Sequence, residues 1–484
     1  MINRKLISKI IGTLLFIEGG LLLICLLLSL YYRENDWFSF AITIGITIIL
    51  GAILKFFGKN AEYKMSKRDG YFVVTISWII FSFIGMLPYY LGNYIPSVTN
   101  AFFETMSGFT TTGASILNNI ESLPHGILFW RSMTQWIGGL GIVFFTIAVI
   151  PTYKMDDVKL FAAEATGPTH DKVHPRIGVT AKWIWSIYLG LTLTETIFLL
   201  FGGMNLFDSI CHSMTTTSTG GYSTRQGGIA SYNSSYIEYV ITIFMFFSGV
   251  NFTLLYYVFL KRKIKKLIQD TEFKYFLGTV SIFTAITTTI LYFTTNMGIE
   301  ESFRKAVFQI VSLQTTTGYT SADYGTWASP LWLLLCITMV IGGCAGSTSG
   351  AVKCVRIAIL SKIGRNEFKR ILHPNAVLPV RINNTTVPQS VRTTLFAFVF
   401  LYLTFIIIGW FAIMCTGVDF MEAFSITVSS LGNVGPGLGR FGPSHSWSEL
   451  PTLGKWISSF LMLVGRLEVF SVLLVLTPGF WKRK

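Results

Sequence analysis

Long apolar stretches, separated by short polar segments, run through the whole 484-residue chain. A hydrocarbon core about 30 Å thick requires roughly 20 apolar residues for each helical crossing, so stretches of that length predict membrane-spanning helices. We expect such helices near residues 10–31, 37–57, 71–92, 127–150, 180–203, 236–260, 274–296, 330–360, 392–416 and 453–477. The pattern therefore predicts an all-α polytopic membrane protein with about ten transmembrane helices.

Four shorter apolar segments lie between the long ones. Their sequences are "AFFETMSGF", "LFDSICHSM", "ESFRKAVFQIVS" and "DFMEAFSITVSS". At about ten to fifteen residues they are too short to cross a bilayer, so we interpret them as re-entrant pore helices. Each is followed by a polar stretch that contains glycine: "FTTTGAS", "TSTGGYST", "TTTGYTS" and "LGNVGPG".

The four polar stretches agree in register when one glycine of each is aligned. These reference glycines are Gly113, Gly221, Gly318 and Gly435, which lie 108, 97 and 117 residues apart. Six residues before them stand Ser107, Thr215, Ser312 and Ser429, and two residues before them stand Thr111, Thr219, Thr316 and Asn433. Repeats of this size are whole structural units. The register predicts pseudo-fourfold membrane-pore-membrane repeats around a central filter.

The repeats also divide the chain into predicted domains. We expect two extra N-terminal transmembrane helices in residues 1–68, followed by pore repeats 1 to 4 in residues 69–178, 179–270, 271–375 and 376–484.

The chemistry of the polar stretches follows from their depth in the membrane. Non-helical backbone survives there only where it is buried in protein or lines a water-filled cavity, so four such loops imply one shared polar pathway. Glycine permits positive φ, which lets successive carbonyls face a common axis, and threonine adds hydroxyl oxygens. A ring of oxygen ligands suits a desolvated monovalent cation. The candidate ligands are Thr111, Thr112, Gly113, Thr219, Gly220, Gly221, Thr316, Thr317, Gly318, Asn433, Val434 and Gly435.

The pore helices add an electrostatic argument. Their C-terminal ends, which carry partial negative charge, would point at the pathway and favour cations. Acids near their outer ends are expected to attract cations to the mouth. These acids are Glu104, Asp208, Glu301, Asp419 and Glu422. The alternative is that threonine and glycine only pack helices closely, which four stretches in register disfavour.

Composition and charge support a membrane protein. Hydrophobic residues make up 51% and charged residues 13% of the chain, with a mean hydropathy of +0.57, which excludes an ordinary soluble domain. The net charge of +14 could indicate nucleic acid. Most lysines and arginines, however, including those of "KRKIKKLIQD" at 261–270, fall in segments that ten crossings and an internal N-terminus place in the cytoplasm. The charge therefore predicts a multi-pass protein in a lipid bilayer with both termini cytoplasmic, and no nucleic-acid partner.

At these four motifs the chain resembles the Trk/Ktr/HKT superfamily of potassium transporters, and within it most closely the bacterial TrkH membrane subunits. The resemblance covers essentially the whole chain. It implies a non-enzymatic protein of the cytoplasmic (inner) membrane, with K+ as transported ion and no organic cofactor. It also implies a homodimer and a cytoplasmic TrkA-like nucleotide-binding regulatory ring. The chain departs from the strict filter pattern at Ala114, Asn433 and Pro436.

The predicted span at 330–360 contains "IGGCAGSTSGAVK", residues 341–353, which no straight helix should accommodate. Its glycines are Gly342, Gly343, Gly346 and Gly350. One interpretation is a kinked helix packed tightly on its neighbours. The resemblance favours the other, a gating loop at 341–350 below the filter, with Lys353 and Arg356 facing the cytoplasm.

The last predicted span carries Arg466 and Glu468 among apolar residues. Charged groups inside a membrane normally face a pathway or a partner. Because the two residues are two positions apart, they point to different sides of a helix and should not neutralise each other. The resemblance implies that Arg466 lies below the filter and repels or paces passing cations. A purely structural ion pair is the alternative.

The sequence can be compared with what two other function classes require. A proton- or sodium-coupled transporter would need a carboxylate in mid-membrane, for which Glu18 and Glu195 are the candidates. A membrane enzyme would need a nucleophile with a base, or a set of metal ligands, and the sequence contains no such combination. His170 and His174 have an i, i+4 spacing, but no third ligand is apparent.

Overall fold

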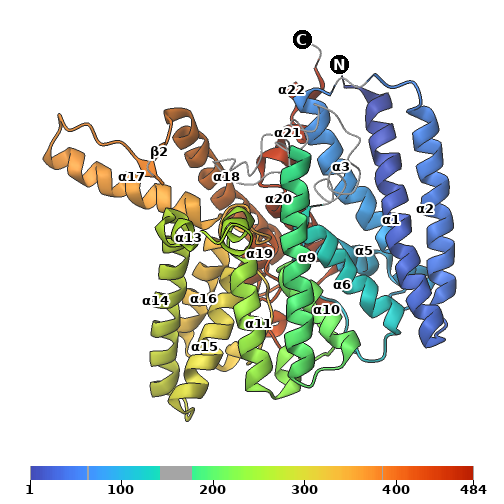
Figure 1. Cartoon of the computed structure of the whole chain (residues 1–484), viewed down its shortest axis with the longest axis horizontal. Helices are drawn as coiled ribbons and strands as arrows, with labels where there is room; N and C mark the ends of the chain where they lie inside the picture. The colour runs from blue at the N-terminus through green and yellow to red at the C-terminus, as the bar shows by residue number, and fades with distance from the viewer. Residues whose placement is uncertain (1, 63–64, 142–176, 384, 483–484) are drawn as a thin grey trace.

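The computed structural model describes residues 2–62, 65–141, 177–383 and 385–482. Most of them form helices that stand side by side in one bundle (Figure 1). At one side stand α1 (Arg4–Tyr32) and α2 (Trp37–Phe57), the two predicted N-terminal helices. Gly12 and Gly51 let them approach closely, because a Cβ on Gly12 would lie 2.7 Å from the Gly51 carbonyl oxygen.

Four units of three elements follow, as the repeat predicts. Their first helices are α3 (Lys67–Gly85) with its continuation α4 (Leu87–Leu91), α9 (Ile177–Phe201), α14 (Thr271–Thr294) and α18 (Gln389–Met414). Their pore helices are α5 (Val98–Phe109), α10 (Leu206–Thr217), α15 (Ile299–Gln314) and α19 (Phe420–Gly432). Their second helices are α6 (His125–Leu140), α11 (Ser235–Ser248) with α12 (Phe252–Phe259), α16 (Ser329–Ile341) with α17 (Cys354–Leu372), and α20 (Thr452–Arg466) with α21 (Phe470–Leu476). The predicted fold class is confirmed.

The second helices differ from the prediction in one respect. The sequence predicts one continuous span at 236–260 and another at 453–477, and both are broken. α11 and α12 meet at a bend of 108°, and α20 and α21 at a bend of 115°. The second bend follows from positive φ at Glu468 and Val469, which ends the helix. The break at 342–353 between α16 and α17 is as predicted, and residues 142–150 of the first repeat's predicted span lie outside the described residues.

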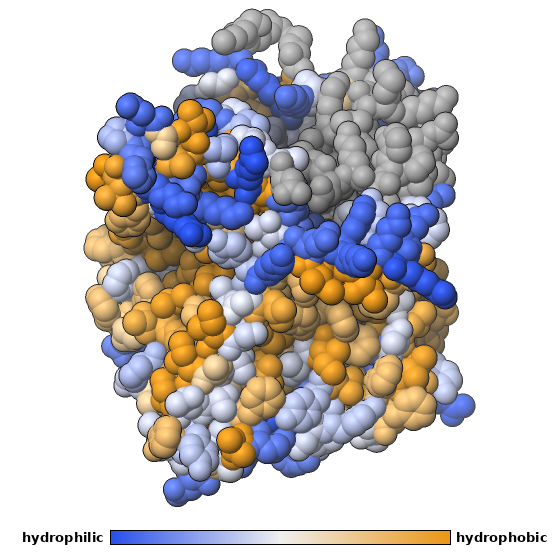
Figure 2. Space-filling model, turned by 60° about the vertical axis from the view of Figure 1, so that its left-hand side comes forward, coloured by the Kyte–Doolittle hydropathy of each residue, from blue (hydrophilic) through white to orange (hydrophobic). Residues whose placement is uncertain are grey.

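In the described part of the chain, six helices are long and apolar enough to cross a membrane, or up to eight if each bent pair counts as one span. The outer helices expose large apolar side chains, among them Phe56 of α2 and Phe400 of α18. Figure 2 shows a broad hydrophobic band across one face, with hydrophilic residues gathered above it and others along the lower edge. Lipid contact explains this distribution, because the apolar residues face outward instead of forming only an interior core.

Short elements lie within and between the repeats. They are η1 (Gly228–Tyr232), α13 (Ile264–Gln269), η2 (Tyr324–Thr326), η3 (Gly439–Phe441), η4 (Trp447–Glu449) and α22 (Pro478–Trp481), and β1 (Arg381–Ile382) pairs antiparallel with β2 (Thr385–Thr386). α17 and this hairpin project from the bundle on the side away from α1 and α2 (Figure 1). Both termini lie at one end of the bundle, where the Arg68 guanidinium donates to the Phe480 carbonyl.

Candidate functional site

The four polar stretches have the same backbone conformation. In each, φ is positive two residues before the reference glycine and again at that glycine. The values are 55° and 82° at Thr111 and Gly113, 55° and 77° at Thr219 and Gly221, 59° and 79° at Thr316 and Gly318, and 54° and 108° at Asn433 and Gly435. Positive φ is unusual for threonine, so its recurrence in three repeats indicates a backbone imposed by its surroundings. Asparagine tolerates this region better, which explains how Asn433 replaces threonine in the fourth repeat.

The pore helices hold this conformation from behind. In every repeat, the amide just before the reference glycine donates to a carbonyl in the last turn of the pore helix. Thr112 donates to Ser107, Gly220 to Thr215, Thr317 to Ser312 and Val434 to Ser429, all at 2.8–2.9 Å. The C-terminal ends of all four helices therefore meet the polar stretches, as the sequence predicts.

The four stretches close into a ring. A Cβ added to each reference glycine would collide with a carbonyl oxygen of one other stretch. Gly113 would meet Gly220 O at 2.1 Å, Gly221 would meet Thr317 O at 2.0 Å, Gly318 would meet Val434 O at 1.9 Å, and Gly435 would meet Thr112 O at 2.5 Å. The contacts run from repeat 1 to 2, 3, 4 and back to 1. Only glycine fits at these four positions.

A small cavity of about 100 Å³ lies against the ring, and all four reference glycines line it. Tyr222, Tyr319 and Pro436, which directly follow three of these glycines, also line it. The sequence places the twelve candidate ligands on four loops, and the structure brings those loops together around this space.

A non-helical segment, residues 342–353, touches the side of the ring nearest the pore-helix ends; we name it the intramembrane loop. The Gly350 amide donates to the Thr316 hydroxyl at 2.7 Å, and the Thr348 hydroxyl donates to the Thr217 carbonyl at 3.1 Å. A Cβ on Gly350 would lie 2.4 Å from the carbonyl oxygen of Gly432. The loop therefore contacts repeats 2, 3 and 4.

The other glycines of the loop fit it against the bend between α11 and α12. Gly342 and Gly346 have positive φ, at 76° and 71°. A Cβ on Gly343 would lie 2.9 Å from the Gly249 carbonyl oxygen, and the Gly346 carbonyl accepts a hydrogen bond from the Phe252 amide.

Arg466 ties the loop to the first repeat. Its guanidinium donates to the carbonyls of Thr348 at 2.8 Å, Gly138 at 2.6 Å and Gly139 at 2.8 Å. Glu468 instead pairs with Arg356 from α17, so Arg466 and Glu468 point to different partners, as the sequence predicts.

The structure corrects the placement of Lys353 and Arg356. The sequence predicts that both face the cytoplasm, but Lys353 is 2% and Arg356 is 7% exposed. The Lys353 ammonium donates to the Ser349 carbonyl of the loop, and the Arg356 guanidinium lies 4.0 Å from the ring of Phe398. Burial costs less for these groups because hydrogen bonds and an aromatic face replace water.

The acids that the sequence predicts to attract cations to the mouth each form an ion pair. The pairs are Glu104 with Arg131, Asp208 with Arg225, Glu301 with Lys305, and both Asp419 and Glu422 with Arg440. Glu104 is 1% exposed and lies beside the polar stretch of the first repeat instead of in solvent. A neutralised carboxylate attracts passing cations only weakly.

The candidate proton-binding acids lie on α1 and α9, outside the four polar stretches. Glu18 of α1 and Glu195 of α9 are both 0% exposed, and among the described residues neither has a hydrogen-bond partner. His170 and His174 lie outside the described residues. The residues that the structure describes contain no group of three or more His, Cys, Asp or Glu side chains that could hold a metal ion.

Sequence reasoning missed the side chains that hold the ring from α6. The Gln135 amide donates to the Gly220 carbonyl at 2.7 Å and accepts from the Tyr222 amide at 3.0 Å. The Tyr222 hydroxyl donates to the Glu104 carbonyl, and the Tyr319 hydroxyl donates to the His212 carbonyl, so each tyrosine joins its repeat to the preceding one. A polar residue on a predicted apolar helix, such as Gln135, was the one sequence signal that could have indicated these contacts.

Comparisons with known proteins agree with this architecture. A family model described as TrkH: Cation transport protein matches residues 37–481. The chain is 37% identical to the Trk system potassium uptake protein TrkH of Escherichia coli K12 over 99% of both chains, and 36% identical to TrkH of Halomonas elongata over 99% of this chain and 100% of the relative. The crystal structure of the potassium transporter TrkH from Vibrio parahaemolyticus matches with a TM-score of 0.89 at 32% identity, covering 100% of both chains. The chain therefore belongs to the TrkH family of cation transport proteins.

Proposed function

We propose that the chain carries potassium into the cell across the cytoplasmic membrane through the ring of four loops. The observation that carries this proposal is ring closure, in which each reference glycine packs against a carbonyl of the next repeat. Positive φ at every second residue of a polar stretch lets neighbouring carbonyls of that stretch face the same side. The ring can therefore offer oxygen ligands to a desolvated cation. The twelve candidate residues from Thr111 to Gly435 are the proposed ligands. The Escherichia coli and Halomonas relatives are named potassium uptake proteins.

Rubidium uptake into vesicles that contain the purified protein tests the proposal. Gly113→Ser and Gly318→Ser should each abolish uptake, because the new side chain would occupy the space of a carbonyl oxygen. Gly278→Ser on α14 is the matched control, since a Cβ there would meet nothing within 4 Å. Wild-type uptake by folded Gly113→Ser protein would contradict the proposal.

We further propose that the intramembrane loop gates this pathway. The loop contacts repeats 2, 3 and 4, and Arg466 links it to repeat 1. Four glycines, Gly342, Gly343, Gly346 and Gly350, lower the barrier to rearrangement, and hydroxyls of the loop can satisfy its backbone in either state. The positive charge of Arg466 would also oppose a cation that stands below the ring.

Deleting several residues between Gly343 and Gly350 should raise rubidium flux and largely preserve cation preference. The gating role is refuted if the deletion leaves the flux unchanged. It is also refuted if the deletion abolishes selectivity while the flux stays low. Both outcomes are measured in the vesicle assay, after the variant is shown to elute as folded protein.

Membership of the family supports a proposal for the assembly. We propose a homodimer with cytoplasmic termini that is regulated by a TrkA-like nucleotide-binding ring. α17 projects beyond the bundle (Figure 1) and exposes Phe368, Ile371 and Leu372 beside basic Lys369 and Arg370, which supports a docking role. Arg370→Glu should reduce the effect of nucleotide on flux in vesicles that contain both proteins, and leave basal flux unchanged. An unchanged nucleotide effect would exclude this contact.

A proton- or sodium-coupled transporter is the second candidate function. Its support is Glu195, a fully buried carboxyl for which the described residues provide no hydrogen-bond partner. Single-channel currents through the reconstituted protein would exclude it. A fixed stoichiometry with a co-ion that Glu195→Gln abolishes would support it.

The repeat boundaries at 69, 179, 271 and 376 stay predictions.

A further inference from the structure

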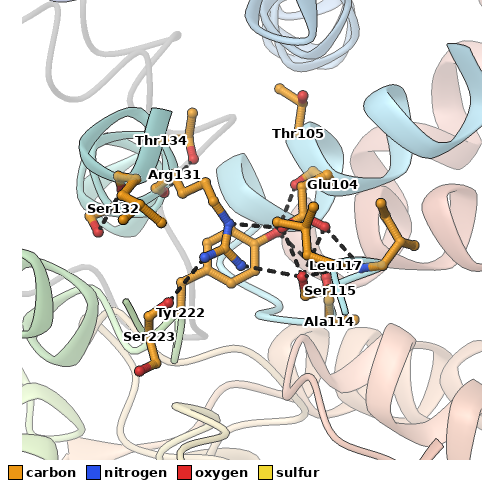
Figure 3. Close-up of polar contacts among 12 residues, drawn as sticks. Glu104, Thr105, Ala114, Ser115, Leu117, Arg131, Ser132, Thr134, Tyr222 and Ser223 are labelled. Atoms are coloured by element: carbon orange, nitrogen blue, oxygen red, sulfur yellow. Dashed lines mark hydrogen bonds and ion pairs between the residues drawn. The ribbon is translucent and has the colours of Figure 1, made fainter. Parts of the chain in front are cut away.

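A buried ion pair lies beside the filter stretch of the first repeat (Figure 3). Arg131 of α6 and Glu104 of α5 are each 1% exposed, and Arg131 Nε lies 3.0 Å from Glu104 Oε1. The Glu104 carboxylate also accepts hydrogen bonds from the Ser115 hydroxyl and from the Ile116 amide, both at 3.0 Å. The carboxylate therefore holds the chain directly after Gly113.

The same guanidinium reaches the second repeat. Arg131 Nη2 donates to the Ser115 hydroxyl at 3.2 Å, and Nη1 donates to the Ser223 carbonyl at 3.0 Å. Ser115 and Ser223 each stand two residues after a reference glycine. The guanidinium carbon also lies 4.2 Å from the centre of the Tyr222 ring (Figure 3). One side chain thus sets the spacing between equivalent points of two adjacent filter loops.

The equivalent position differs in the other repeats. Nine residues before the reference glycines stand Glu104, His212, Gln309 and Ile426. His212 Nε2 lies 3.0 Å from the Ser223 hydroxyl, and the Gln309 amide donates to the Tyr319 carbonyl at 3.4 Å. Ile426 cannot make such a bond. At this position the side chain is therefore charged in the first repeat, polar in the second and third, and apolar in the fourth.

Stability alone does not account for a buried ion pair. Its desolvation penalty offsets most of its Coulombic gain, so an apolar pair of similar volume is often as stable. The planar guanidinium, however, fixes the directions of several hydrogen bonds at once, which neither lysine nor an apolar side chain can do. The pair is therefore suited to holding two loops at a fixed separation.

We propose that the Glu104–Arg131 pair is a positioning pair that determines ion specificity: it holds the loops of repeats 1 and 2 at the separation that favours potassium over the smaller sodium ion. The pair does not touch the ion and acts through Ser115 and Ser223. This inference rests on the proposed filter function. A looser ring could contract around sodium, so loss of the pair should lower selectivity more than it lowers flux.

The test measures rubidium and sodium uptake by the full-length protein in vesicles. Glu104→Gln keeps the size of the side chain but removes the charge, and it should lower the rubidium-to-sodium ratio by about tenfold. Arg131→Lys, which keeps the charge but cannot reach both loops, should lower the ratio to a similar extent. Ser115→Ala, a milder change, should lower it by about threefold.

Glu238→Gln is the matched control. Glu238 of α11 is 6% exposed and pairs with Arg304 of α15, but the bonds of this pair reach no residue of the ring. Its removal should leave the ion ratio at the wild-type value. The apparent half-saturation for rubidium should rise in Glu104→Gln and stay unchanged in Glu238→Gln, which separates positioning from general destabilisation.

The outcomes distinguish this inference from the filter proposal. If Gly113→Ser abolishes uptake while folded Glu104→Gln and Ser115→Ala keep the wild-type ratio, the filter stands and the positioning role is wrong. If Gly113→Ser leaves both uptake and the ratio unchanged, the filter proposal itself fails. If Glu104→Gln does not fold, Ser115→Ala decides, because it removes only a hydroxyl at a position that is not fully buried.

Discussion

The first and fourth repeats reach the same backbone conformation by different means. In the first, a charged pair from α5 and α6 holds the chain after Gly113. In the fourth, hydroxyls of its own pore helix hold the first residues of the loop: Ser429 accepts from the Gly435 amide and Ser425 from the Leu438 amide, both at 2.9 Å. A carboxylate, Glu422, acts only farther along, where it accepts from the Arg440 amide at 2.9 Å. The backbone of the ring is therefore fourfold, whereas the side chains that support it are not.

The comparison extends to the side of the ring that faces the intramembrane loop. There Asn433 of the fourth repeat donates to the Thr112 hydroxyl at 3.1 Å and to the Met462 carbonyl at 2.9 Å. Threonine, which holds this position in the other repeats, has one donor and could not donate to both groups. The fourth repeat thus joins the ring to α20 on the side of the intramembrane loop. The first repeat joins the second on the opposite side, through Arg131 and Ser223.

The largest expected difference concerns the reference glycines. Gly113→Ala should reduce rubidium uptake at least 100-fold, whereas Gly435→Ala should reduce it less, because the added Cβ would lie 2.1 Å from a carbonyl oxygen in the first case and 2.5 Å in the second. Both positions have positive φ, so neither change is neutral. Equal losses in vesicle uptake would show that backbone strain, and not the space in the ring, dominates.

A smaller effect is expected from making the fourth repeat resemble the others. Asn433→Thr should lower the free energy of unfolding by about 1–3 kcal/mol, because the Met462 carbonyl loses its buried donor. Thermal unfolding in detergent measures this change. Stability equal to that of the wild type would mean that the asparagine is not needed to join the loop to α20.

The smallest effect is expected at Ser425. Ser425→Ala removes the acceptor of the Leu438 amide and should cost about 1 kcal/mol of unfolding free energy. Rubidium uptake should fall by less than about threefold, because the bond lies three residues beyond Gly435. A loss as large as that of Gly435→Ala would place the support of the fourth repeat at this hydroxyl.

The sequence predicts the ring well because its residues depend on local rules. Positive φ favours glycine, so Gly113, Gly221, Gly318 and Gly435 mark the loops directly, and the short apolar segments before them mark the pore helices. The unusual loop at 342–353 is visible for the same reason, since its glycines are dense.

The supporting contacts could not be predicted in this way. Glu104 and Arg131 lie 27 residues apart on different helices, and only tertiary packing brings them together. The bends after α11 and α20 lie inside stretches whose mean hydropathy is high enough for a single span, so hydropathy alone does not reveal them. From the sequence, Lys353 and Arg356 look like cytoplasmic charges. Their partners, the Ser349 carbonyl and Glu468, come close to them only through the fold of the loop and of the last helix, which the sequence does not show.

Rubidium anomalous diffraction tests the central claim most directly. Crystals grown in rubidium should show anomalous density on the axis of the ring, close to the carbonyls of residues 111–113, 219–221, 316–318 and 433–435. Replacing rubidium with sodium should remove or shift that density. Rubidium bound instead at Glu195, with an empty ring in protein that still transports, would contradict the account.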